Sequence, residues 1–75
     1  MTTRTMEPIG GAAIAFLRRV SIEGEGSLYA ESRAEEQRAG TCVKRGYLKR
    51  DQMDAALFHI TGEGRAYLAK LARAH

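Results

Sequence analysis

The sequence predicts a small α+β domain with about four helices and a two- or three-stranded antiparallel sheet. Three observations support this class. Apolar residues recur at helical spacing near the N-terminus, a capping sequence opens a helix at Ser32, and apolar alternation around Phe58 precedes another capped helix. The chain has 75 residues, a size at which a single core only just outweighs chain entropy. We therefore expect one domain over residues 1–75, with residues 1–7 flexible.

A first helix is expected in the N-terminal third of the chain. Its apolar residues, at the spacing of a helix with one buried face, are Ile9, Ala13, Phe16, Leu17 and Val20. Val20 and Ile22 then alternate with Ser21, which predicts a short strand that joins the sheet. The EGEG sequence of residues 23–26 predicts a turn.

The middle of the chain predicts two consecutive helices. Ser27 is a suitable cap for a short helix that runs through Glu31. Ser32 begins a longer helix that ends at Arg45, because the S-x-x-E pattern at Ser32 is a capping box that satisfies two backbone donors. Two helices that meet at Ser32 would form a helix-turn-helix. One continuous helix over residues 28–45 is the alternative that the sequence leaves open.

The longer helix has one apolar stripe, formed by Ala39, Cys42 and Val43. We expect this stripe to face the core, because these positions lie on one side of a 3.6-residue helix. Gly46 follows the helix and supplies the left-handed residue that commonly ends one.

The second half of the chain predicts a β-hairpin and a closing helix. Residues 47–50 form the first strand, residues 51–55 the loop at its tip, and residues 57–60 a second strand in which buried and exposed positions alternate. Thr61 is expected to cap the last helix. The packing residues of that helix are Tyr67, Leu68 and Leu71.

This order of elements resembles the C-terminal half of a winged helix. The sequence KRGYLKR is similar to the end of a recognition helix followed by the first wing strand. The sequence LFHITGEGRAYL is similar to the second wing strand and closing helix of MarR-like and PadR-like regulators. The resemblance covers roughly residues 27–72. It implies a winged helix-turn-helix fold and a small transcriptional regulator that binds DNA.

The distribution of charge favours the same region as the binding surface. The chain has a net charge of +3. Residues 33–50 carry six basic and two acidic side chains, a net charge of +4, whereas residues 1–32 sum to −1 and residues 51–75 to zero. A local excess of cations is typical of a surface that binds phosphates.

We expect the helix over residues 32–45 to enter the major groove of double-stranded DNA. Arg and Gln side chains are suited to guanine and adenine edges, while Lys and Thr suit phosphates. The predicted DNA-binding residues are Arg33, Gln37, Arg38, Thr41, Lys44, Arg45, Lys49 and Arg50. A homodimer would read a short pseudo-palindrome and would use the first or last helix, with Tyr67 and Ala74 as contacts.

Two features depart from the family pattern. Glu35 and Glu36 stand at the start of the expected recognition helix, and the wing tip carries Asp51 and Asp54 in place of cations. DNA repels carboxylates, so we expect this wing not to insert into the minor groove. The alternative function is a winged-helix module that binds a host protein, such as a small phage-type inhibitor or adaptor.

No catalytic, cofactor or metal site is predicted. Cys42 lies on the apolar stripe and is expected to be a core residue. With one Cys the chain cannot form an internal disulfide, which is typical of the reducing cytoplasm. His59 is expected at the surface, and two distant His with one Cys give no zinc spacing. A Ser-His-Asp set exists in the composition, but the sequence specifies no geometry for it, so we expect no enzyme activity.

The N-terminal apolar run also predicts neither a leader nor a membrane span. The run covers residues 9–17, whereas a spanning helix needs about 20 residues. Arg18 and Arg19 follow it directly, where a signal sequence would place small residues and a cleavage site. We therefore expect a cytoplasmic protein without a membrane partner.

Overall fold

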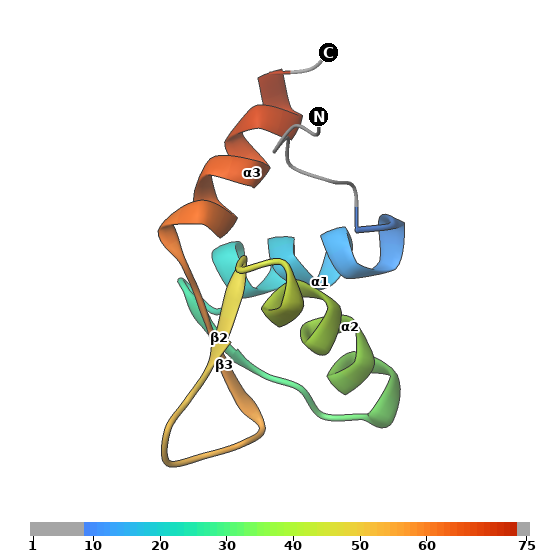
Figure 1. Cartoon of the computed structure of the whole chain (residues 1–75), viewed down its shortest axis with the longest axis vertical. Helices are drawn as coiled ribbons and strands as arrows, with labels where there is room; N and C mark the ends of the chain where they lie inside the picture. Colours follow the sequence, from blue (N-terminus) through green and yellow to red (C-terminus); the bar gives the residue numbers. More distant parts are fainter. Residues whose placement is uncertain (1–8, 74–75) are drawn as a thin grey trace, which may run out of the picture.

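The computed structural model describes residues 9–73, which contain three helices and one three-stranded antiparallel sheet. The elements follow in the order α1 (Gly11–Ile22), β1 (Ser27–Tyr29), α2 (Arg33–Lys44), β2 (Leu48–Arg50), β3 (Leu57–Ile60) and α3 (Gly62–Arg73), as Figure 1 shows. The predicted α+β class is confirmed. The described residues form three helices, however, where about four were expected.

β3 is the central strand of the sheet, whose order is β1-β3-β2. Both neighbours run antiparallel to β3, and Phe58 pairs with Leu28 on one side and with Arg50 on the other. Phe58 is fully buried and Leu48 is almost so. One face of the sheet therefore packs against the helices, and the arrangement is compatible with a winged helix.

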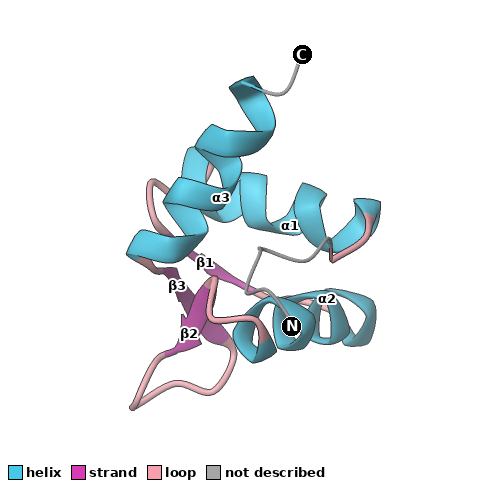
Figure 2. Ribbon diagram, turned by 45° about the horizontal axis from the view of Figure 1, so that its top comes forward, coloured by secondary structure: helices cyan, strands magenta, loops and turns pink. Residues whose placement is uncertain are grey.

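The helices form a layer in which α1 lies between α3 and α2 (Figure 2). The core joins Phe16, Leu17 and Val20 of α1 to Ala39 and Cys42 of α2, and all five side chains are buried. Figure 1 shows that α2 and the loop between β2 and β3 lie at the end of the molecule opposite α3. The expected inward orientation of the apolar stripe is thereby confirmed for Ala39 and Cys42, two of its three members.

α1 continues through Ile22, so the strand expected over residues 20–22 is not formed. Val20 is fully buried and Ile22 is 72% exposed, because they lie on different sides of the last helical turn. The predicted turn at residues 23–26 is present, and Gly26 has a φ of 108°. At that angle a residue with a side chain would be strained.

Ser27 begins strand β1 and not a helix, which corrects the prediction of a short helix through Glu31. The Gly26 carbonyl accepts from the N–H of Ile60, and the Ala30 N–H donates to Ala56, so pairing with the neighbouring strand takes up this backbone. No second helix therefore meets α2 at Ser32. The predicted helix-turn-helix is absent from residues 9–73, as is the alternative of one helix over residues 28–45.

α2 begins and ends as predicted. Ser32 is its N-cap, and the Ser32 Oγ accepts from the Glu35 N–H at 3.1 Å. The Glu35 carboxylate accepts in turn from the Glu31 N–H at 2.8 Å, one residue earlier than in a standard capping box. Gly46 follows the helix with a φ of 82°, the left-handed conformation that ends many helices.

α3 is capped by Thr61, as expected: the Thr61 Oγ1 accepts from the Gly64 N–H at 2.9 Å. The same hydroxyl donates to the Gly46 carbonyl, which ties the start of α3 to the end of α2. The rings of Tyr47 and Tyr67 stack with centroids 4.4 Å apart. Because Tyr67 is only 4% exposed, it is a core residue and unavailable for the predicted dimer contact; Ala74 lies outside the described residues.

Within residues 9–73, no helix combines the length and apolar character that crossing a bilayer would require.

Candidate nucleic-acid interface

The face of α2 that points away from the core carries most of the residues predicted to bind DNA. Ala39 and Cys42 are fully buried, and Val43 packs against the core at partial exposure. Seven of the eight predicted residues are exposed, and Thr41 is half-buried. We call the six of them on the helix and its C-cap the α2 face: Arg33, Gln37, Arg38, Thr41, Lys44 and Arg45.

The α2 face is continuous along the helix. Thr41, Lys44 and Arg45 line one depression. Gln37 and Arg38 line a second, together with Thr41, so the two depressions share this residue. The Thr41 hydroxyl donates to the Gln37 carbonyl at 3.2 Å, which leaves its oxygen lone pairs as acceptors. The surface therefore offers guanidinium, ammonium and amide donors within three helical turns.

The second depression also contacts the first turn of α1, through residues 9–13. The first N–H groups of an α-helix have no partner within it, and Gly10 at the N-cap makes no side-chain capping bond. No acidic side chain occupies this first turn. The positive end of the α1 dipole therefore adds to the cationic character of the α2 face. The sequence did not predict this contribution, which depends on how two distant segments pack.

Lys49 and Arg50 on β2 are both exposed. Arg50 in addition makes two contacts with the hairpin. The Arg50 guanidinium donates to the Ala55 carbonyl across the hairpin loop. It also lies over the Phe58 ring, with its central carbon 4.7 Å from the ring centroid. Arg50 thus stabilises the hairpin in addition to being exposed, a role that the sequence prediction missed.

The carboxylate of Glu35 is turned toward α1 and away from the α2 face. Its Oε2 accepts from an Arg19 guanidinium nitrogen at 2.9 Å, and Oε1 accepts from the Glu31 N–H. The Glu31 bond and then the Arg19 bond lower the pKa of Glu35, so the group is ionised and paired. Glu36 remains exposed. One of the two carboxylates expected to repel DNA at this helix start is therefore paired within the fold with Arg19, which also pairs with Glu23 at 3.3 Å.

The two carboxylates of the hairpin loop are also bound within the fold. We call residues 51–56 the wing loop. Asp51 Oδ2 accepts from the N–H groups of Met53 and Asp54, at 2.9 and 3.0 Å. Asp54 Oδ1 accepts from the Ala56 N–H at 3.1 Å. These acidic side chains thus shape the loop, while Met53 beside them is 92% exposed.

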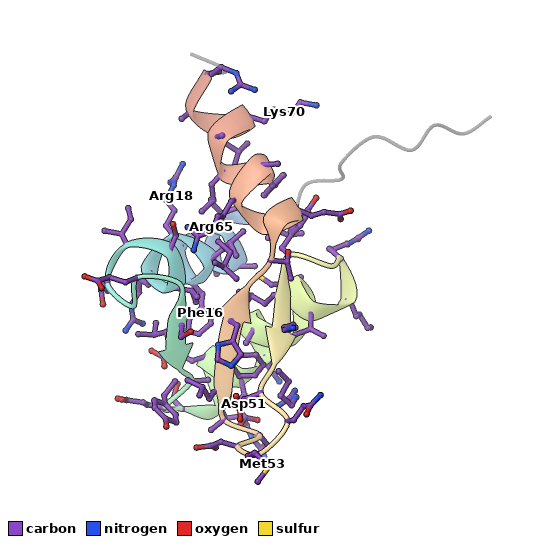
Figure 3. The ribbon with its side chains drawn as sticks, turned by 90° about the vertical axis from the view of Figure 1, so that its left-hand side faces the viewer. Phe16, Arg18, Asp51, Met53, Arg65 and Lys70 are labelled. Carbon is purple, nitrogen blue, oxygen red and sulfur yellow. The ribbon has the colours of Figure 1, made fainter. Side chains whose placement is uncertain are left out.

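Figure 3 shows where other cations lie relative to this loop. Arg18, Arg65 and Lys70 lie in the half of the molecule that holds α1 and α3, whereas Asp51 and Met53 lie at the far end. Arg18 and Lys70 are exposed, so they provide cations of similar exposure outside the α2 face.

The remaining reactive side chains are structural or bonded to one another. Burial raises the pKa of Cys42 to about 11, which makes its thiol a poor nucleophile. His59 hydrogen-bonds to both Ser27 and Asp51, so the structure does assemble a Ser-His-Asp chain. The described residues contain no group of three metal-ligating side chains.

Comparisons with protein families, curated proteins and solved structures return no match for this chain.

Proposed function

We propose that this protein binds double-stranded DNA in a sequence-specific manner, with α2 in the major groove, and acts as a small transcriptional regulator. The observation that carries the proposal is the α2 face, whose cations are exposed while Glu35 is turned away and paired with Arg19. A helix is the element that fits the major groove, where Arg and Gln discriminate bases. Lys44 would contact a phosphate, whereas the Thr41 oxygen, which is left as an acceptor, suits the amino group of a base.

The test is the salt dependence of duplex affinity for Arg38→Ala/Arg45→Ala, measured by fluorescence anisotropy. Each phosphate contact contributes a slope of about −0.9 in log affinity against log salt concentration, so the slope flattens by about 1.8 if both arginines contact phosphates and by less if either contacts a base. The matched control is Arg18→Ala/Lys70→Ala, which removes the same charge from α1 and α3, outside the α2 face. Equal effects of the two double variants, or no binding of any duplex at low salt, would contradict the proposal.

A base contact is distinguished from a phosphate contact by its dependence on sequence. If Arg38 or Arg45 reads a guanine, substitution lowers specificity at one position by about 1–3 kcal/mol. A phosphate contact lowers the affinity for all duplexes alike. Selection of binding sites with the wild-type protein and with each single variant separates the two cases, and a homodimer would select a pseudo-palindrome.

A second function, binding to a host protein as an inhibitor or adaptor, is favoured by a different observation. Ile22 and Tyr29 are large apolar side chains that are 72% and 48% exposed, and Glu23, Glu25 and Glu31 nearby in the sequence are exposed as well. Exposed apolar residues rimmed by charge mark protein interaction sites when they are contiguous. Recovery of a stoichiometric protein partner after nuclease treatment, lost in Ile22→Ser/Tyr29→Ser, would support this function; an unchanged recovery would contradict it.

A further inference from the structure

His59 connects all three strands of the sheet through two short hydrogen bonds. Its Nδ1 lies 2.7 Å from the Ser27 Oγ on β1, and its Nε2 lies 2.8 Å from the Oδ1 of Asp51, the residue directly after β2. In the sheet register His59 is paired with both Ser27 and Lys49. The imidazole therefore bridges the two edge strands from the central strand.

The direction of both hydrogen bonds follows from the charge of Asp51. The hydrogen bond from His59 and those from two backbone N–H groups lower the pKa of Asp51, so its carboxylate is ionised and only accepts. The Nε2 of His59 must then carry the proton that it donates. In the neutral imidazole, Nδ1 is left as an acceptor for the Ser27 hydroxyl.

Asp51 also links His59 to the backbone of the wing loop. The oxygen not used by His59 accepts from the N–H groups of Met53 and Asp54. One carboxylate thus joins the imidazole to the backbone of the loop tip. The Arg50 bond to the Ala55 carbonyl closes the loop from its other side.

The same three residues do not form a hydrolytic site. Stabilisation of a tetrahedral intermediate needs N–H donors aimed at the developing oxyanion. The N–H of Ser27 donates to the Gly24 carbonyl, and the N–H of Gly26 donates to the Val20 carbonyl. The backbone donors closest in sequence to the hydroxyl are therefore engaged in the turn, and the chain of bonds is suited to positioning.

We propose that His59 is a positioning residue, which ties Asp51 to Ser27 and so holds the wing loop in one conformation in the free protein. The loop then presents Met53, which is 92% exposed, and it directly follows β2, which carries the exposed Lys49. Preorganisation lowers the ordering cost when a partner binds. The use of the loop against duplex DNA rests on the proposed function, whereas the positioning itself does not.

The first test is the tautomer of His59, read from long-range ¹H–¹⁵N spectra at a pH where the imidazole is neutral. The wild-type protein should carry the proton on Nε2. In Asp51→Asn, the new amide oxygen still accepts from the loop N–H groups, but its NH₂ faces Nε2, which becomes an acceptor. The proton should then move to Nδ1. An Nε2–H tautomer in both proteins, or averaged shifts in the wild type, would overturn the proposal.

The second test compares His59→Leu with His59→Gln by amide hydrogen exchange. Leucine removes both bonds, and exchange at Met53 and Asp54 should accelerate about tenfold, as expected for one lost hydrogen bond to a charged group. Glutamine retains a donor for Asp51 and an acceptor for Ser27, so it should restore most of the protection. Amides of α2 serve as the control and should not change. Equal exchange rates at Met53 and Asp54 in both variants, or acceleration throughout α2, would contradict a positioning role for His59.

The third test measures duplex affinity for the same two variants. His59→Leu should weaken binding about fivefold, and His59→Gln should recover it, if a preorganised loop contributes to the contact. Wild-type affinity in His59→Leu would contradict the use of the loop against DNA. Absence of any duplex binding by the wild type would overturn the proposed function, and the tautomer and exchange measurements would still decide the positioning role.

Discussion

Alkylation of Cys42 is expected to be at least about 200 times slower in the folded protein than in the unfolded chain. The side chain is fully buried between α2 and α1, and its Sγ lies 3.6 Å from the Ala13 carbonyl oxygen. The thiolate is the reactive form of cysteine. Because burial raises the pKa of Cys42 to about 11, only about 0.1% of the thiol is ionised at pH 8.

The magnitude follows from comparison with an ordinary thiol. A cysteine with a pKa of about 8.5 is about one quarter ionised at pH 8, which gives a ratio of about 200 before any effect of access. Reaction in the folded state should rise about tenfold per pH unit from pH 7 to 9, without levelling. Burial of the sulfur slows it further, since the reagent needs an opening of the structure.

The assay is the pseudo-first-order rate of iodoacetamide labelling, followed by mass spectrometry in buffer and in denaturant. Gln37→Cys in a Cys42→Ala background is the control, because residue 37 is exposed on the same helix and should react at the rate of an ordinary thiol. A labelling rate for folded Cys42 within tenfold of the unfolded rate would refute the inward orientation of the stripe. That result would also remove the basis for assigning the opposite side of α2 to DNA.

Three further predictions concern stability. In Gly64→Ala, a Cβ would stand 2.3 Å from the Tyr47 carbonyl oxygen, so thermal denaturation should show a loss of about 1–3 kcal/mol; Gly62→Ala, whose Cβ would meet nothing within 4 Å beyond its chain neighbours and its own helix backbone, should show none. Ser32→Ala removes the N-cap of α2 and should lower the free energy of unfolding by about 1 kcal/mol. The pKa of Asp51 is lowered in the fold, so its stabilising contribution is present above the ordinary value of about 3.9 and is lost as pH falls through the folded pKa. The protection of wing-loop amides, taken relative to their intrinsic exchange rates, should fall only in that acid range, and a fall near neutral pH would count against the assigned bonds.

The elements predicted correctly are those with local signals. The cap at Ser32, the left-handed Gly46 and the cap at Thr61 each depend on residues within four positions, so the sequence alone identifies the ends of α2 and the start of α3. β1 was missed because three residues carry too little periodicity. Its conformation is decided by pairing with Leu57–Ile60, about thirty residues away in the chain.

The residues of the candidate site could be predicted from the sequence, but the ion pairs and hydrogen bonds of the neighbouring side chains could not. Exposure of the α2 face follows from helical periodicity once Ala39 and Cys42 are placed inward. The pairing of Glu35 with Arg19 spans 16 residues and depends on how α1 crosses α2. The bonds of Asp51 to His59 and of Arg50 to Ala55 depend on the closed hairpin. The charges at the helix start and in the wing loop could therefore be read from the sequence, but the partners of those side chains could not.

The most direct test of a DNA-binding α2 face is a map of amide chemical shifts during titration with a selected duplex. The account predicts that the largest changes fall on Gln37, Thr41 and Lys44, with smaller changes at Lys49 and none along the exposed side of α3. The largest changes on α3, or on Tyr29 and its neighbours in β1, would contradict it.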